Sequence, residues 1–342
     1  MIMIPAAGGT MQPAVGLIAN PASGKDIRRL IAHGSVFDNN EKANIIRRVL
    51  QALDAFGVKQ VLAMPDLYGL VLRALEDTQV GLRVEFVNIS VTNTAADSRL
   101  AAAVMAQAGV RCIVTVGGDG TNRVVAQGCG DVPLVPISTG TNNVFPSLVE
   151  STLAGMAAAA VACDVEPVWD RAVRQARRLE IVRGNTLVET ALVDVVVYDE
   201  RFVATRAIWD ADKMRALFLT APYRGTIGAS AIAAYLPQAE EVARDAAGLY
   251  VELGPGGTHV MAPIAPGLIV PVSVRVVHPL ELEQTIPVTY APSILALDGE
   301  REVPVPPGTS VGVRLSSHGP YVVDVQAALQ AAVKAGFFIR KP

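Results

Sequence analysis

Cysteine and histidine are scarce in this sequence. Cys112, Cys129 and Cys163 are its three cysteines, and each stands among apolar or small residues. An odd and small number of cysteines argues against a disulfide framework and favours a reducing, cytoplasmic compartment. The four histidines show no spacing typical of a metal site.

Long apolar runs and a surplus of one charge are also missing. The best candidate for a membrane span is broken by Pro263, Pro266 and Pro271, so no stable membrane insertion is expected. Residues 1–5 lack the charged and apolar regions of a signal peptide. With a net charge of −3 and no basic stripe, the chain is not expected to bind nucleic acid.

The composition instead predicts ordered globular structure, and the length allows two domains. Over residues 1–163, apolar strands alternate with helical patterns, which predicts an α/β nucleotide-binding domain with a parallel sheet and helices on both faces. The expected strands are 14–19, 60–63, 83–87, 112–116 and 134–137, and the expected helices are 41–56, 65–76, 94–107, 122–127 and 144–162.

Residues 164–319 have a different, strand-rich pattern, which predicts a β-rich acceptor domain. The expected strands are 179–182, 189–198, 202–207, 248–253, 268–277, 294–297 and 310–315, with helices near 210–218 and 226–236 and turns at 254–257 and 304–308. A last helix, at 322–334, is expected to pack back on the first domain as part of residues 320–342.

The strongest functional signal is Gly117-Gly118-Asp119-Gly120-Thr121, directly after a buried strand. The glycines leave backbone N–H groups open to an anion, and a helix start adds partial positive charge. Asp119 would then lie beside a phosphate, where its carboxylate could hold a metal or accept a proton. The structural alternative is a Gly-rich turn with a capping aspartate.

Two further strands end in polar loops of the same kind. Asn20 and Ser23 belong to the first loop, Asn20-Pro21-Ala22-Ser23-Gly24-Lys25. Because ligands of parallel sheets bind beyond the carboxyl ends of the strands, the loops together predict a nucleotide site. A strand-exit turn and a helix N-cap are the structural alternatives. The candidate nucleotide-binding residues are Asn20, Ser23, Gly117, Gly118, Gly120, Thr121, Thr139, Gly140, Thr141, Asn142 and Asn143.

Two segments of the second domain are candidates for the opposite wall. Asp298-Gly299-Glu300 is typical of a hairpin turn, yet its acids could also face Asp119 across a cleft and serve phosphoryl transfer as metal clamp and base. Residues 225–230 form a second Gly-rich helix entry, in which Thr226 and Ser230 are candidate acceptor-binding residues. Neither a Walker loop nor a Gly-x-Gly-x-x-Gly motif occurs.

These motifs resemble those of the superfamily of NAD kinases and diacylglycerol or sphingoid-lipid kinases, over almost the whole chain. Residues 117–121 match its signature, whereas Asn20-Pro21-x-Ser23-Gly24, Thr139-Gly140-Thr141-x-Asn143 and Asp298-Gly299-Glu300 resemble the lipid-kinase branch. Residues 262–268 resemble the Pro-Ile-x-Pro turn of NAD kinases. The overall pattern is most similar to the subgroup called acetoin-catabolism protein X.

The resemblance implies an active site between the two domains, with Asp119, Asp298 and Glu300 as catalytic residues. It implies an ATP-dependent phosphotransferase that uses Mg²⁺ and phosphorylates NAD, or a related small hydroxyl compound, in a homo-oligomer of two or four chains. A lipid kinase and a nucleotide-sensing protein without turnover are the alternatives.

One position departs from the NAD kinases. Where they carry an Asn-Glu pair that contacts the dinucleotide, this chain has Val193-Asp194. Asp194, the acid of this pair, is a candidate acceptor-binding residue. Valine cannot make the hydrogen bonds of asparagine, so NAD is expected to bind weakly or in a different pose. Val193→Asn is then expected to improve NAD affinity.

Overall fold

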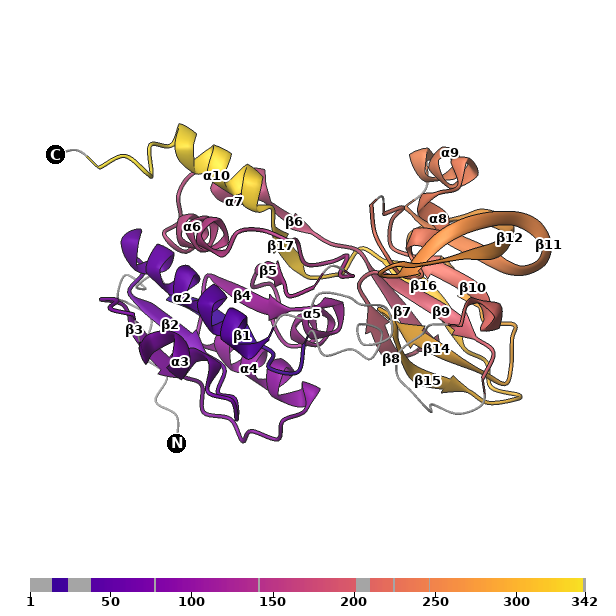
Figure 1. Ribbon diagram of the computed structural model, residues 1–342, viewed down its shortest axis with the longest axis horizontal. Helices are drawn as coiled ribbons and strands as arrows, with labels where there is room; N and C mark the ends of the chain where they lie inside the picture. Colours follow the sequence, from indigo (N-terminus) through magenta and orange to yellow (C-terminus); the bar gives the residue numbers. More distant parts are fainter. Residues whose placement is uncertain are drawn as a thin grey trace.

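The chain forms two lobes, one built on a parallel sheet and the other on antiparallel sheets (Figure 1). The computed structural model describes residues 14–23, 38–76, 78–140, 142–200, 210–223, 225–245 and 247–340. The predicted fold class, an α/β domain followed by a β-rich one, is confirmed. None of the described helices is long and apolar enough to cross a membrane.

The first lobe is organised by a sheet with the order β3-β2-β1-β4-β5-β17-β6 among the described residues. Its strands are β1 (Ala14–Ala19), β2 (Gln60–Ala63), β3 (Arg83–Phe86), β4 (Cys112–Gly117), β5 (Leu134–Ser138), β6 (Val173–Gln175) and β17 (Tyr321–Val323). All neighbours pair in parallel except β6, which is antiparallel to β17. In the register, Val116 lies opposite both Ala19 and Ile137, so β1, β4 and β5 end level.

Helices cover both faces of this sheet because its strands are apolar on both faces. The helices are α2 (Asn39–Ala55), α3 (Leu70–Glu76), α4 (Ala95–Gln107), α5 (Asp119–Ala126), α6 (Ser151–Ala162), α7 (Val168–Ala172) and α10 (Val325–Lys334). Leu17 and Val114 face a core that includes residues of α2, α3, α6, α7 and α10. Ile18 and Ile113 face a second core with residues of α4 and α5.

Several of these helices begin at residues other than those predicted. Helix α3 begins at Leu70 rather than 65, and α10 at Val325 rather than 322. Helix α5 begins at Asp119 rather than 122, so the Gly-rich motif forms its N-cap and first turn. Helix α6 begins at Ser151 rather than 144, where the side chain of Glu150 accepts hydrogen bonds from the amides of Thr152 and Leu153. The start of α6 is set by this capping contact, which the apolar pattern does not locate, whereas the N-cap of α5, Gly118, makes no side-chain hydrogen bond.

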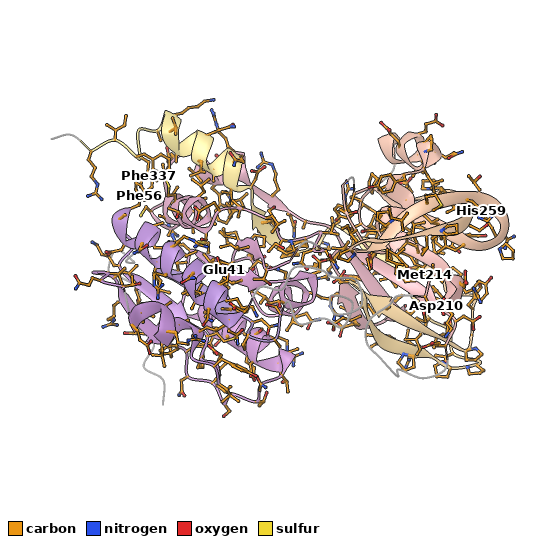
Figure 2. All side chains as sticks on the ribbon, in the orientation of Figure 1. Glu41, Phe56, Asp210, Met214, His259 and Phe337 are labelled. Carbon is orange, nitrogen blue, oxygen red and sulfur yellow. The ribbon has the colours of Figure 1, made fainter. Side chains whose placement is uncertain are left out.

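The C-terminal segment returns to the first lobe. Helix α10 packs on α6 and α7, and β17 inserts between β5 and β6. Phe56, at the end of α2, lies 5.6 Å from Phe337 between ring centroids, and the two are neighbours in Figure 2. Residues 168–175 therefore share this sheet and core, beyond the predicted boundary at 163/164.

The second lobe is a β-sandwich. Its strands are β7 (Arg178–Arg183), β8 (Thr186–Ala191), β9 (Asp194–Tyr198), β10 (Met214–Leu219), β11 (Gly248–Ala265), β12 (Leu268–Leu280), β13 (Thr285–Pro287), β14 (Ser293–Leu297), β15 (Glu300–Val305) and β16 (Gly312–Ser316). They form sheets of order β12-β11-β10-β9-β14-β15 and β13-β16-β7-β8, which share a core. The helices α8 (Ala231–Ala234) and α9 (Pro237–Asp245) cover the other face of the larger sheet.

Three sequence predictions for this lobe are wrong. The single strand expected at 189–198 is two strands, β8 and β9, which belong to different sheets. Of the helix predicted near 210–218, only the 3₁₀ turn Ala211–Lys213 is helical, and Met214–Leu219 is strand β10. An apolar run of this length does not distinguish a buried strand from a helix. The turn at 254–257 is a bulge within β11, since Leu253 and Thr258 both pair with Val274. The predicted strand 202–207 lies outside the described residues.

Candidate functional site

A cleft of about 1060 Å³ lies where the carboxyl ends of the parallel strands face the second lobe. Strand β1 stands between β2 and β4, and the chain proceeds from it in both directions, which is the switch point where open α/β sheets bind ligands. The first lobe contributes residues 20–23, 64–66, 93–99, 118–121 and 142–144, among others. The second contributes Glu189, Asp194, residues 227–230 and residues 298–300.

The three polar loops predicted from the sequence meet at this cleft, and their roles in binding stay predictions. The predicted residues that line it are Asn20, Ser23, Gly118, Asp119, Gly120, Thr121, Asn142, Asn143, Asp194, Ser230, Asp298 and Glu300. Gly117, Thr139, Gly140 and Thr226 are not among its lining residues, and Thr141 lies outside the described residues. Thr226 stays close, with its hydroxyl 3.4 Å from that of Ser230.

Side-chain hydrogen bonds join these loops to one another. Asn20 Nδ2 donates to Thr121 Oγ1 over 2.9 Å, and Thr139 Oγ1 donates to Ser23 Oγ over 3.1 Å. At Gly117, a Cβ would approach the Thr121 side chain to 2.6 Å, so glycine is needed for close packing there. The loops after β1, β4 and β5 therefore form one preorganised edge.

Asp119 holds the loop after β5 in place. Its carboxylate accepts hydrogen bonds from the amide of Val144, at 3.0 Å, and from that of Phe145, at 2.7 Å. The residue is 9% exposed and lines the cleft. Asp119 thus combines contact with the cleft and a structural bond between two loops, so the functional and structural interpretations of this residue are compatible.

Lys42 of α2 anchors the loop after β1, a role that no sequence motif predicts. It is fully buried on α2, and its Nζ donates to the carbonyls of Asn20 and Pro21 at 3.0 Å and of Ser23 at 2.7 Å. The sequence offers one indication of this role: Lys42 falls on the apolar face of α2, which also buries Ile46. A charged residue on an apolar helix face needs polar partners.

The Asp298-Gly299 pair forms the tight turn between β14 and β15. Asp298 has φ of +51° and Gly299 of +83°, as a type I′ hairpin requires. None of the Asp298 side chain is exposed, and its carboxylate accepts hydrogen bonds from the amides of Leu192, Val193 and Asp194. The structural interpretation of this motif, a hairpin turn, is therefore observed, with an added bonding role for the acid.

Arg123 reaches the same carboxylate from the other lobe. Its Nε lies 3.6 Å from Oδ2 of Asp298, and its side chain is 4% exposed. Burial raises the pKa of Asp298, while Arg123 and the three amides oppose that shift. Nothing in the sequence pattern marks Arg123, because its partner is distant in the chain.

Glu300 is the predicted catalytic acid that is most accessible to a ligand. It is half-buried, whereas Asp119 and Asp298 are buried. It approaches the first turn of α5 from the second lobe, since a Cβ on Gly120 would come within 3.9 Å of Glu300 Oε1. Tyr223, also missed from the sequence, lies near the acids: burial raises its pKa to about 12, and Asp298, Asp119 and Asp194 add to the shift.

Val193 does not line the cleft. Its side chain is buried, at 1% exposure, while the next residue, Asp194, lines the cleft. An asparagine at 193 would therefore bury an amide rather than offer it to a ligand, so the predicted gain in NAD affinity from Val193→Asn has no geometric support.

Within the described ranges, no group of three or more His, Cys, Asp or Glu residues is placed to hold a metal ion. His259, for example, lies on the β11–β12 hairpin, at the end of the second lobe far from the first (Figure 2). The acids of the cleft therefore do not fit a Mg²⁺ cage made by protein ligands alone.

Comparison with known proteins agrees with this architecture. The family model of the ATP-NAD kinase N-terminal domain matches residues 15–165, and that of the acetoin catabolism protein X C-terminal domain matches residues 177–318. Acetoin catabolism protein X of Cupriavidus necator is 39% identical over 96% of this chain and 95% of its own length. The chain belongs to the acetoin catabolism protein X family. Its first lobe is an NAD-kinase-type domain.

Replacing Lys42 by methionine is expected to lower the free energy of unfolding by about 1–3 kcal/mol, because three carbonyls of the 20–23 loop lose their donor. Lys59→Met removes the same charge from an exposed position of the same lobe and is expected to have little effect. Urea denaturation measures both. Equal midpoints for the two variants would show that Lys42 does not anchor the loop.

Asp119→Ala and Asp119→Asn are expected to differ in stability. Alanine leaves the amides of Val144 and Phe145 without their acceptor, at a cost of about 1–3 kcal/mol, whereas asparagine keeps one acceptor oxygen and costs less. Thermal unfolding of both variants compares them. If asparagine destabilises as much as alanine, the carboxylate acts through its charge and not through these hydrogen bonds.

Proposed function

We propose that this protein transfers a phosphoryl group from ATP to a hydroxyl of a small polar acceptor, with NAD or a related nucleotide as the first candidate. The observation that carries the proposal is the cleft between the lobes. Its first wall holds Gly118, Gly120 and the N-terminus of α5, and its second wall holds Glu300. Phosphoryl transfer needs a phosphate cradle and a positioned base, and these walls offer one of each.

The donor would bind against the first lobe. The N-terminus of α5 presents backbone amides and partial positive charge to an anion, and the loops after β1 and β5 flank it. ATP would enter as its Mg²⁺ complex, in which phosphate oxygens supply metal ligands, because the described residues do not make a cage of their own.

Glu300 is the proposed base. As the acceptor hydroxyl oxygen forms its bond to the terminal phosphorus of ATP, the bond between that phosphorus and the bridging oxygen breaks, and ADP leaves. The hydroxyl proton passes to the Glu300 carboxylate. Asp119 and Asp298 are assigned positioning roles, because their carboxylates accept hydrogen bonds from backbone amides.

A lipid acceptor is less well supported. The second wall of the cleft contains Glu189, Asp194, Asp298 and Glu300, whereas Ile227 and Ala229 are its apolar side chains. A hydrocarbon chain would take water away from Glu189 and Glu300, the two half-buried acids of this wall, which costs free energy. A polar, hydroxyl-bearing acceptor suits this wall better.

The direct experiment is a thermal-shift screen with ATP, polyphosphate, NAD and NADP, each with and without Mg²⁺. A ligand of the native state at about 100 times its dissociation constant stabilises by roughly 2.7 kcal/mol. Pairs that stabilise are then incubated together, and ³¹P NMR detects a new phosphate ester and ADP. Binding without a new ester would support the nucleotide-sensing alternative, and no binding would overturn the proposal.

Glu300→Gln is expected to lower kcat by about 10²–10⁴-fold, the usual effect of losing a positioned acid or base, with donor affinity retained. Glu281→Gln is the matched control, since it removes one carboxylate from an exposed position of the same lobe outside the cleft. Steady-state release of ADP gives kcat, and titration calorimetry gives affinity. Turnover near the wild-type rate in Glu300→Gln would remove Glu300 from the chemistry.

A further inference from the structure

Helix α5 bonds directly to the second lobe. Arg123 approaches Asp298, and Gln127 Nε2 donates to Glu189 Oε1 over 2.5 Å. The same helix carries Gly118 and Asp119 at its N-terminus. One short helix therefore contacts both walls of the cleft, and its bonds decide how the walls face each other.

The segment 192–194 forms a small anion-binding site that the protein fills with its own carboxylate. Three consecutive amides, those of Leu192, Val193 and Asp194, converge on Asp298 at 2.8–3.3 Å. Successive backbone N–H groups arranged in this way form a concave site for an anion. The internal occupant, Asp298, comes from a turn more than one hundred residues away in the chain.

This amide site has a support that does not depend on Asp298. Thr220 Oγ1 donates to the carbonyl of Leu192 over 2.9 Å, and the Thr220 amide donates to the carbonyl of Val193 over 3.0 Å. The carbonyl side of the segment is thus fixed by β10 and the residue that follows it. Removing the Asp298 side chain should leave the amides in place and open to another anion.

Arg123 closes the site with a buried positive charge. The two side chains of the pair are 4% and 0% exposed, so solvent screens their interaction weakly. Removing one partner of such a pair leaves a buried charge uncompensated, whereas removing both does not. Replacing one residue of the pair should therefore destabilise the contact between the lobes more than replacing both.

We propose that Arg123 is a positioning residue that acts through Asp298: the guanidinium and the amides of 192–194 clamp the Asp298 carboxylate, and this clamp fixes the β14–β15 turn with Glu300 across from α5. The role of Glu300 rests on the proposed function. The clamp itself does not, and stability measurements test it without any assay of turnover.

Chemical rescue tests the clamp. Asp298→Gly suits the positive φ of the turn and removes the CH₂–COO⁻ group, which acetate nearly replaces. Acetate is expected to raise the unfolding midpoint of Asp298→Gly by at least about 3 °C more than that of wild type, at matched ionic strength with chloride as the reference. Equal acetate shifts in the two proteins would overturn the internal anion site.

The rescue must also depend on Arg123. In Arg123→Met/Asp298→Gly, acetate is expected to act no more strongly than on wild type, because the site has lost its cation. Rescue that persists in this double variant would show that the amides act alone and would overturn the role of Arg123.

A pair comparison separates the clamp from general packing. Arg123→Met is expected to be less stable than Arg123→Met/Asp298→Asn, because the second change removes the uncompensated charge. Arg111→Met, which breaks an exposed ion pair with Asp164 at 2.8 Å, is the control and is expected to be nearly neutral. If the losses of stability from Arg123→Met and Asp298→Asn were additive, the result would contradict the clamp.

The positioning role predicts a specific kinetic pattern. Arg123→Met is expected to lower kcat at least about tenfold with the KM for ATP within a factor of two, since the donor wall is intact and the base is displaced. A decrease in kcat together with an equally large increase in the KM for ATP would indicate collapse of the cleft and would contradict the positioning role. If wild type shows no phosphoryl transfer, the proposed function fails while the rescue and pair results still decide the clamp.

Discussion

The level ends of β1, β4 and β5 are the constraint on which the rest of the cleft depends. Because Val116 lies opposite Ala19 and Ile137, the loops that follow the three strands begin at the same edge. Asn20 can then reach Thr121, and Thr139 can reach Ser23, although these pairs are 101 and 116 residues apart in the chain. Lys42 fixes this edge from the α2 side.

Two aspartates of the cleft act as anchors for backbone amides. Asp119 binds the loop after β5 within the first lobe, and Asp298 binds residues 192–194 within the second. A carboxylate that accepts several N–H groups is fixed in orientation, and its neighbours are fixed with it. Gly120 directly follows Asp119 and Glu300 is two residues after Asp298, so both main-chain anchors lie beside the point where Gly120 and Glu300 approach each other.

The sequence predicts the parallel strands β1 to β5 and the three polar loops correctly. Buried parallel strands are apolar runs, and the loops that follow them are rich in Gly, Asn and Thr. It placed the start of α5 too late, since glycines 118 and 120 are poor helix formers and mask a helix that begins at Asp119. Strand β10 was mistaken for a helix because its apolar run has no clear period. The hydrogen-bond partners of Asp298 and Lys42 could not be predicted from the sequence, because long-range hydrogen bonds leave no local pattern.

The antiparallel pairing of β6 with β17 gives the second lobe its mode of attachment. The chain leaves the first sheet after Gln175 and re-enters it at Tyr321, and these two residues are opposite each other in the ladder. The second lobe is therefore a continuous insertion whose two ends are neighbours, connected through a two-stranded ribbon (Figure 1). Such a connection resists sliding of one lobe along the other and leaves bending and twisting of the ribbon as the soft motions. Bending changes the width of the cleft, twisting changes the alignment of its walls, and the contacts of α5 with the second lobe oppose both motions.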